Sequence, residues 1–247
     1  MAELGSSLAS PFRDPAWPAR TLVGAALEIL PVLFVAPLIV RLLHGGYRLR
    51  TREAALLGIA ALVALLCRWI EIGYLRRLAL AVLAGADNVL PRWDRFRSDL
   101  AEGFKLSLVT LGLFLPAVGT ATALALTAAA LGAARLAWVP VVVVMPVLAL
   151  LTLLYLPAAL LTAIATGDLG AAFAAGNVLR FIERWPSRYA LAFVITLMAL
   201  LLAQLGFVLL CIGVFATRFL ANCIGVHAFA SAYRDARGPV EPGRSAP

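Results

Sequence analysis

The stretch "VPVVVVMPVLALLTLLYLPAALLTAI", Val139 to Ile164, contains no charged side chain. A helix needs roughly 20 mostly apolar residues to cross about 30 Å of hydrocarbon, and this stretch is longer than that. Inside a bilayer every backbone polar group must be satisfied within the protein, and a helix does this by itself. The stretch therefore predicts a transmembrane helix, and it indicates the class of the whole chain.

The composition of the chain supports a membrane protein. Its 247 residues are 63% hydrophobic and 14% charged, with a mean hydropathy of +0.96, which is outside the usage of soluble domains. Cys67, Cys211 and Cys223 lie in apolar runs, where a secreted-type disulfide framework would not be built. The net charge of +8 comes from short basic tracts beside apolar runs, which is typical of membrane topology signals. We therefore expect no nucleic-acid partner.

The apolar runs predict an all-α fold, a polytopic helical membrane protein with about six transmembrane helices. The last run is too long for one crossing, and Cys211 to Gly213 is the predicted turn because glycine permits a tight reversal. A single kinked, tilted helix is the alternative. Residues 1–20 are a predicted interfacial segment, residues 21–234 the transmembrane domain, and residues 235–247 a disordered tail. The predicted spans are 21–43, 54–75, 105–131, 139–164, 188–210 and 213–233.

The distribution of arginine and lysine predicts the orientation of the chain, since cytoplasmic loops carry an excess of both. With six spans, most basic residues fall on the side of the two termini, and the tract "GGYRLRTR", Gly45 to Arg52, is an exception on the other side. Met1 to Trp17 is polar and lacks the apolar core of a signal peptide. We expect a multi-pass protein of the cell (cytoplasmic) membrane with both termini in the cytoplasm.

Three stretches combine aromatic side chains, arginine, an acid and proline just before a predicted span. They are "PFRDPAW" (Pro11 to Trp17), "LPRWDRF" (Leu90 to Phe96) and "FIERWPSRY" (Phe181 to Tyr189). Arginine can reach lipid phosphate, the aromatic ring favours the interface, and proline fixes the start of a helix. They predict three helical hairpins, each introduced by a cytoplasmic interfacial segment. The predicted anchors are Trp17, Trp93, Trp185, Arg92 and Arg95.

The stretch "GDLGAAFAAGNVLRFIERW", Gly167 to Trp185, predicts an amphipathic helix in the membrane plane. Asp168 is placed to cap it by accepting from exposed N–H groups of the first turn. Such a helix either connects two spans or recognises a lipid or a partner. Its predicted apolar face consists of Leu169, Phe173, Gly176, Leu179 and Ile182.

Several of these motifs occur together in one known family. "FRDPAW", Gly73 to Asp94 ("GYLRRLALAVLAGADNVLPRWD"), Glu102 to Val109 ("EGFKLSLV") and Thr166 to Phe173 ("TGDLGAAF") make the chain resemble a prokaryotic multi-pass membrane family, domain of unknown function four thousand and thirteen. Arg92 stands where members of this family often show an acid. The resemblance implies a multi-pass membrane protein, and it implies no substrate, cofactor or catalytic residue.

Known catalytic and metal-binding patterns are missing from the sequence. The two histidines, His44 and His227, have no partner at His-x-x-x-His spacing, and no Cys-x-x-Cys pair occurs. Neither a phosphate-binding glycine loop ending in Gly-Lys-Ser/Thr nor a Gly-x-Ser-x-Gly elbow is found. We therefore expect no enzyme, no cofactor and no metal.

Charged side chains inside predicted spans are the remaining functional candidates, because burying them in hydrocarbon is costly. At ~1.5 Å per residue, Glu28, Arg68 and His227 fall at similar depths. Arg68 and Glu71 are three residues apart on one helix and can pair, leaving Glu28 for Arg68 or for His227. The cluster either locks helices together as ion pairs or forms a substrate or proton pathway.

Three functions follow from these patterns. The leading one is a non-enzymatic scaffold or accessory protein whose cytoplasmic face binds lipids or a partner. The alternative is a small-solute or lipid transporter that uses Glu28, Arg68 and His227, and a membrane enzyme is disfavoured. Expected partners are membrane lipids and other membrane subunits. Tightly packed charge pairs would favour the scaffold, and a ligand-sized cavity at these side chains would favour transport.

Overall fold

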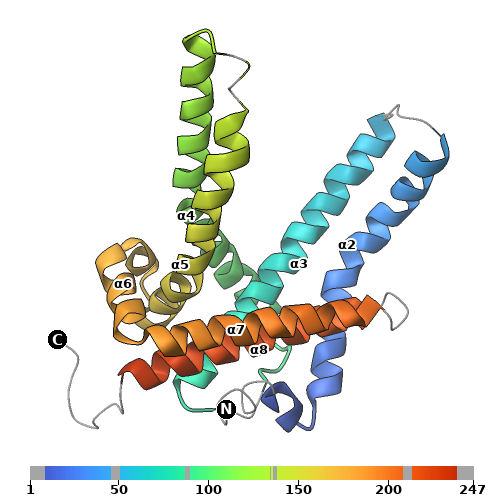
Figure 1. Ribbon diagram of the computed structural model, residues 1–247. Coiled ribbons are helices and arrows are strands. Elements are labelled where there is room, and N and C mark those ends of the chain that lie inside the picture. Colours follow the sequence, from blue (N-terminus) through green and yellow to red (C-terminus); the bar gives the residue numbers. More distant parts are fainter. Residues whose placement is uncertain are drawn as a thin grey trace. The chain divides into compact units, whose positions relative to one another are not determined.

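A computed structural model describes residues 9–45, 51–86, 90–133, 135, 138–207 and 213–237. Every regular element within these residues is helical (Figure 1). The predicted all-α fold class is therefore confirmed for the described part of the chain.

Six of the described helices contain a stretch long and apolar enough to cross a membrane, as predicted. These helices carry most of the described residues, and short helices flank some of them. The long helices are α2 (Trp17–Gly45), α3 (Thr51–Leu83), α4 (Phe96–Ala130), α5 (Met145–Thr166), which follows the π-helix η3 (Pro140–Val144), α7 (Pro186–Gln204) and α8 (Gly213–Arg237). The short ones are η1 (Pro11–Arg13), η4 (Leu169–Phe173), α6 (Ala175–Arg184) and η5 (Leu205–Phe207).

The chain divides into two compact units. Unit 1 comprises Met1–Phe104 and Trp185–Pro247, and unit 2 comprises Lys105–Arg184. The first turns of α4 belong to unit 1, and the rest of that helix belongs to unit 2.

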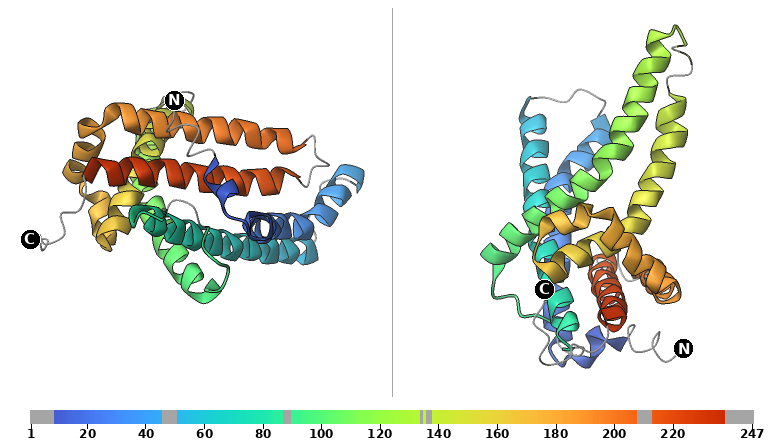
Figure 2. Two further views of the ribbon diagram at one scale, coloured as in Figure 1. Left: turned by 90° about the horizontal axis from the view of Figure 1, so that it is seen from below. Right: turned by 90° about the vertical axis from the view of Figure 1, so that its left-hand side faces the viewer.

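Helix α8 is the centre of unit 1. It lies side by side with α7 and also contacts α2 and α3, which it crosses obliquely (Figures 1 and 2). Small residues allow this close packing. A Cβ atom on Gly225 of α8 would lie 2.9 Å from Thr196 of α7, and one on Gly24 of α2 would lie 2.5 Å from the Phe219 ring of α8. The core of unit 1 therefore forms where α8 meets its three neighbours.

Two glycines bring α3 and the first turns of α4 into backbone contact. A Cβ atom on Gly73 would lie 2.0 Å from the carbonyl oxygen of Asp99, and one on Gly103 would lie 1.7 Å from that of Trp69. No side chain larger than hydrogen fits at either position without moving a helix.

Both of these helices are longer than the sequence predicts. Helix α3 continues to Leu83 instead of ending near residue 75, and α4 begins at Phe96 instead of residue 105. The added turns carry opposite charges that face one another across the two helices. Arg76 Nε of α3 lies 3.5 Å from Glu102 Oε2 of α4, so the added turns are joined to each other by an ion pair.

Other boundaries also differ from prediction. Helix α2 begins at Trp17, inside the predicted segment 1–20, because Asp14 accepts a hydrogen bond from the Ala16 N–H (2.8 Å) at its start. Helix α8 continues to Arg237, into the predicted tail, because Asp235 pairs with Arg188 at 2.6 Å. Residues 238–247 of the tail lie outside the described residues.

The last apolar run forms two helices, α7 and α8, rather than the single kinked helix of the alternative prediction. Of the predicted turn, Cys211 and Ile212 lie outside the described residues, and Gly213 begins α8.

The predicted single helix at Gly167 to Trp185 is interrupted. Asp168 caps η4 by accepting from the Gly170 N–H (2.9 Å), but Ala174 has a non-helical ψ of 78° and separates η4 from α6. The two segments do not present one continuous apolar face. The predicted face is therefore partly exposed, with Phe173 51% and Leu179 45% accessible, and Val178 is buried instead.

Candidate functional site: charge pairs among the spanning helices

The predicted pair of Arg68 and Glu71 is confirmed, and it has a third member. Arg68 Nη1 donates to Glu71 Oε2 at 2.6 Å, and Asn222 Nδ2 of α8 donates to Glu71 Oε1 at 2.8 Å. The Glu71 side chain is only 3% exposed. Both of its oxygens therefore have donors, one from its own helix and one from α8. This contact joins α3 to α8 through a buried carboxylate.

Glu28 has a different partner from the two that the sequence predicts. Its side chain is 10% exposed, and its Oε2 lies 3.8 Å from Arg218 Nε of α8. Glu28 Oε1 is buried and has no hydrogen-bond partner among the described residues. The ion pair that the structure gives Glu28 is with Arg218, whereas Arg68 is bonded to Glu71. His227 is buried on α8.

Sequence reasoning missed the roles of Arg218 and Asn222. It compared depths by counting residues from span ends, which assumes helices that run parallel, whereas α8 crosses α2 and α3 obliquely (Figure 1). Counting the acids and arginines inside the predicted spans would have indicated the role of Arg218. Once Arg68 pairs with Glu71 on the same helix, Glu28 is left without a cation, and Arg218 is an arginine inside an apolar run.

A second polar cluster joins the start of α2 to the segment before α4, and its centre is Asp14. This carboxylate is 2% exposed and pairs with Arg20. It also accepts from the backbone N–H of Leu90 at 2.8 Å, while Arg20 donates to the Leu90 carbonyl. Residues that precede the first span are thereby tied to the segment that precedes α4. We refer to the contacts of Asp14, Arg20 and Leu90 as the Asp14 clasp.

Trp93 packs inside this region of unit 1. Its Nε1 donates to the Arg20 carbonyl at 2.9 Å, and its ring stacks on the buried Tyr74 ring with centroids 4.0 Å apart. The Phe219 ring of α8 lies 5.8 Å away. Trp93 therefore makes aromatic and hydrogen-bonding contacts with protein, and its depth in a bilayer stays a prediction.

Arg77 holds the segment after Leu90 against α3. Its guanidinium donates to the carboxylates of Asp94 (3.1 Å) and Asp99 (2.7 Å) and to the Arg92 carbonyl (2.9 Å). Asp99 is 1% exposed, so Arg77 supplies the charge that its burial requires. The polar residues in the motifs around Gly73 and Leu90 therefore serve largely to bond these two stretches of the chain to each other.

The other predicted anchors make aromatic contacts or are exposed. Trp17 packs edge-on against Phe12 with centroids 5.0 Å apart, and the Arg188 guanidinium lies 5.3 Å from the Trp185 ring centroid. The side chains of Arg92 and Arg95 are exposed. Their proposed contact with lipid headgroups stays a prediction.

A metal centre is not found in the described part of the chain, where no three His, Cys, Asp or Glu side chains are grouped to hold an ion. The charged side chains described above are engaged mainly with each other and with backbone groups.

The comparison with protein families identifies the chain. The model of a family described as protein of unknown function (DUF4013) matches residues 56–212. The chain belongs to the DUF4013 family. The matched part of this DUF4013 protein includes Tyr74, Arg77, Trp93 and Asp99, whereas the Asp14 side of the clasp lies outside it. No curated protein and no solved structure matches the chain. The family and the six apolar helices make it a multi-pass integral membrane protein.

Proposed function

We propose that this DUF4013 protein is a non-enzymatic membrane scaffold or accessory protein. The observation that carries the proposal is the shared carboxylate of Glu71, which takes donors from α3 and α8 at 2.6 and 2.8 Å. A buried acid held by two helices fixes their register, as a structural ion pair does. The charged groups of unit 1 thereby stabilise one arrangement of α2, α3 and α8.

The exposed halves of these pairs support a partner at the surface of unit 1. The Arg68 side chain is 48% exposed and that of Arg218 is 61% exposed, although both lie in apolar helices. Each arginine already pairs with one carboxylate of unit 1, but in hydrocarbon the exposed N–H donors of its guanidinium still need partners. A lipid headgroup or another membrane subunit would supply those partners. We also propose that both termini and the clasp side of unit 1 face the cytoplasm.

The test asks whether the pair of Arg68 and Glu71 is structural or part of a substrate pathway. It removes the charges of both side chains and keeps the hydrogen bond from Asn222. Arg68→Leu strands the Glu71 carboxylate and should lower the free energy of unfolding by about 3 kcal/mol, the lower end of the cost of breaking a buried pair. Adding Glu71→Gln removes the stranded charge and still accepts from Asn222, so the double variant should regain most of that stability. Unfolding of the purified protein in detergent measures both effects.

Arg180→Leu is the control for loss of one arginine, because its side chain is exposed on α6 in unit 2 and its contacts there are local to that helix. It should change stability little. A double variant as unstable as Arg68→Leu alone would contradict the structural role of the pair.

A proton-coupled transporter is the second candidate, and Glu28 is the observation that favours it. Its buried Oε1 without a hydrogen-bond partner is a position where a proton would bind. The experiment uses the protein in liposomes that contain a pH-sensitive dye, with an imposed membrane potential. Proton entry that Glu28→Gln abolishes, while the variant remains folded, would favour transport. Entry equal to that of empty liposomes for both proteins would favour the scaffold.

A further inference from the structure

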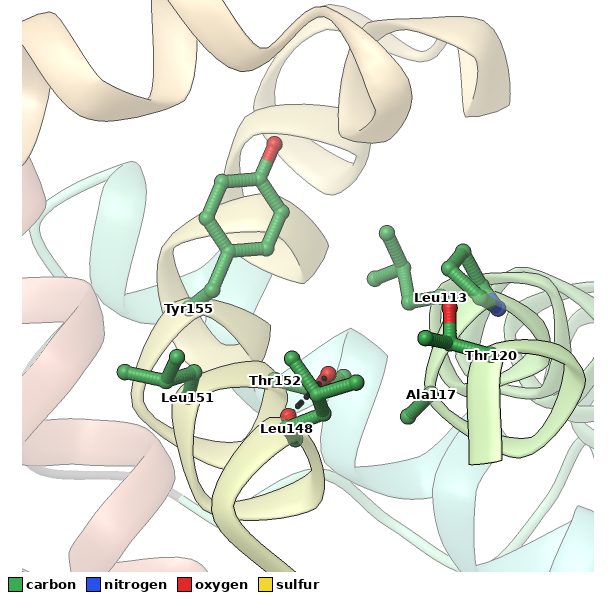
Figure 3. A pocket seen from close by; sticks show the side chains of 8 residues that line it. Leu113, Ala117, Thr120, Leu148, Leu151, Thr152 and Tyr155 are labelled. Atoms are coloured by element: carbon green, nitrogen blue, oxygen red, sulfur yellow. Dashed lines mark hydrogen bonds between the residues drawn. The ribbon is translucent and has the colours of Figure 1, made fainter. Parts of the chain in front are cut away.

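Unit 2 contains a pocket between its two long helices that none of the contacts above uses. The volume is about 340 Å³, within the range of small-molecule sites. Figure 3 shows the wall from α4 facing the wall from α5 across the gap. The α4 wall includes Leu113, Ala117 and Thr120, and the α5 wall includes Leu148, Leu151 and Tyr155.

The pocket is lined mainly by hydrocarbon, and two of its polar groups are already bonded. Thr152 Oγ1 donates to the Leu148 carbonyl at 2.9 Å, and the Tyr155 hydroxyl donates to the Ala172 carbonyl at 2.9 Å. Both walls belong to helices that are candidate membrane spans. Leu151 is 57% exposed, so the pocket is accessible from the surface of the unit. In a bilayer that surface meets acyl chains rather than water.

One end of the pocket is next to η4, which follows α5. Tyr155 bonds to Ala172 of η4, and the neighbouring Phe173 ring lies against Gly112 of α4, where an added Cβ would be 2.9 Å from the ring. Helix η4 thus bridges α5 and α4 at the Tyr155 end. Helix α6 begins after Ala174.

Helix α6 exposes charged side chains of both signs. Arg180, Glu183 and Arg184 are all exposed. A zwitterionic headgroup, with one phosphate and one ammonium, offers each of them an opposite charge. A free fatty acid has only a carboxylate and would leave Glu183 without such a partner.

We propose that the α4–α5 pocket holds one acyl chain of a zwitterionic phospholipid whose headgroup lies beside η4 and α6. An empty gap of this size would forfeit dispersion contacts along both walls, and an acyl chain restores them without a polar partner. The assignment goes beyond the scaffold proposal, because it names a ligand for unit 2 and does not depend on the charge pairs of unit 1.

The experiment uses the full-length protein in phosphatidylethanolamine nanodiscs that contain a small fraction of the same lipid with a photoreactive diazirine in its acyl chain. After illumination, mass spectrometry locates the labelled peptides. We expect labelling to concentrate on the pocket-lining parts of α4 and α5.

Two variants fill the pocket from opposite walls, and each has a control on the same helix outside the lining. Ala117→Leu is compared with Ala123→Leu on α4, and Leu148→Trp with Leu150→Trp on α5. The pocket variants should lose the concentrated labelling, and the controls should retain it. Using both walls keeps the test decisive if one variant does not fold.

Three outcomes would overturn the proposal. The first is labelling spread evenly over all exposed faces of α4 and α5, which is the pattern of bulk lipid. The second is equal labelling of pocket variants and controls. The third is pocket labelling by a diazirine fatty acid but not by the phospholipid, which would assign the pocket to a free acid.

Discussion

Replacing Gly73 by alanine should separate α3 from the start of α4. The added Cβ would lie 2.0 Å from the Asp99 carbonyl oxygen, whereas ordinary van der Waals contact begins at 3.4 Å. The colliding atom is backbone, so no side-chain rotation relieves the clash. One helix must move by about 1.4 Å, which is larger than the slack of a close-packed interior. The same movement would lengthen the 2.7 Å bond between Arg77 and Asp99.

The size of the effect follows from two opposing terms. Overpacking typically costs about 1–3 kcal/mol, and replacing glycine by alanine inside a helix returns roughly 0.5–1 kcal/mol. Gly58 on the same helix has nothing within 4 Å of an added Cβ, so Gly58→Ala should show only the favourable term. Both variants gain this favourable term, so Gly73→Ala should be less stable than Gly58→Ala by the overpacking cost alone, about 1–3 kcal/mol.

The assay unfolds both variants and the unchanged protein in the same detergent. Size-exclusion chromatography measures the folded fraction of each. Gly103→Ala is a second case, since its Cβ would lie 1.7 Å from the Trp69 carbonyl oxygen, and it should behave like Gly73→Ala. Coincident unfolding curves for Gly73→Ala and Gly58→Ala would refute the close approach of the two helices.

Three further predictions concern the contacts of unit 1 and the orientation of the chain. Arg77→Leu should lower the free energy of unfolding by about 3–5 kcal/mol, because it strands the buried Asp99 carboxylate, and adding Asp99→Asn should recover much of that loss. An unchanged free energy of unfolding in Arg77→Leu would show that the pair contributes nothing. Trp93→Phe should cost about 1 kcal/mol, because it loses the hydrogen bond to the Arg20 carbonyl, while its ring still stacks on Tyr74; an equal loss for Trp93→Phe and Trp93→Ala would count against that stacking. Reporter domains fused to each terminus should both report the cytoplasm, and opposite sides would contradict the predicted orientation.

Interactions within one helix were accessible from the sequence. The three-residue spacing of Arg68 and Glu71 predicts their pair, since residues three apart share a helix face. Likewise, Asp168 caps η4 as predicted, because capping depends on the next few residues alone. The number of apolar helices also follows from local composition. These features need no knowledge of how helices pack.

Contacts between distant segments were not accessible in the same way. The pairing of Glu28 with Arg218 depends on the oblique crossing of α8, which residue counting does not reveal. The sequence placed Trp93 at the membrane interface because aromatic residues gather there, but its ring stacks on Tyr74 of α3, 19 residues earlier in the chain. The sequence shows that the stretches containing Asp14 and Leu90 have similar compositions. Only the structure shows that these residues contact each other.

The two donors of Glu71 become available at very different times during synthesis. Asn222 follows Glu71 by 151 residues, which is roughly 8–30 s of translation at about 5–20 residues per second. Arg68 precedes Glu71 by three residues and can bond to it as soon as that turn of α3 has formed. The local arginine thus accompanies the carboxylate while α3 enters the bilayer, and Asn222 completes the contact once α8 has been made. Loss of Arg68 should therefore reduce the yield of inserted protein during synthesis even where the completed protein tolerates it.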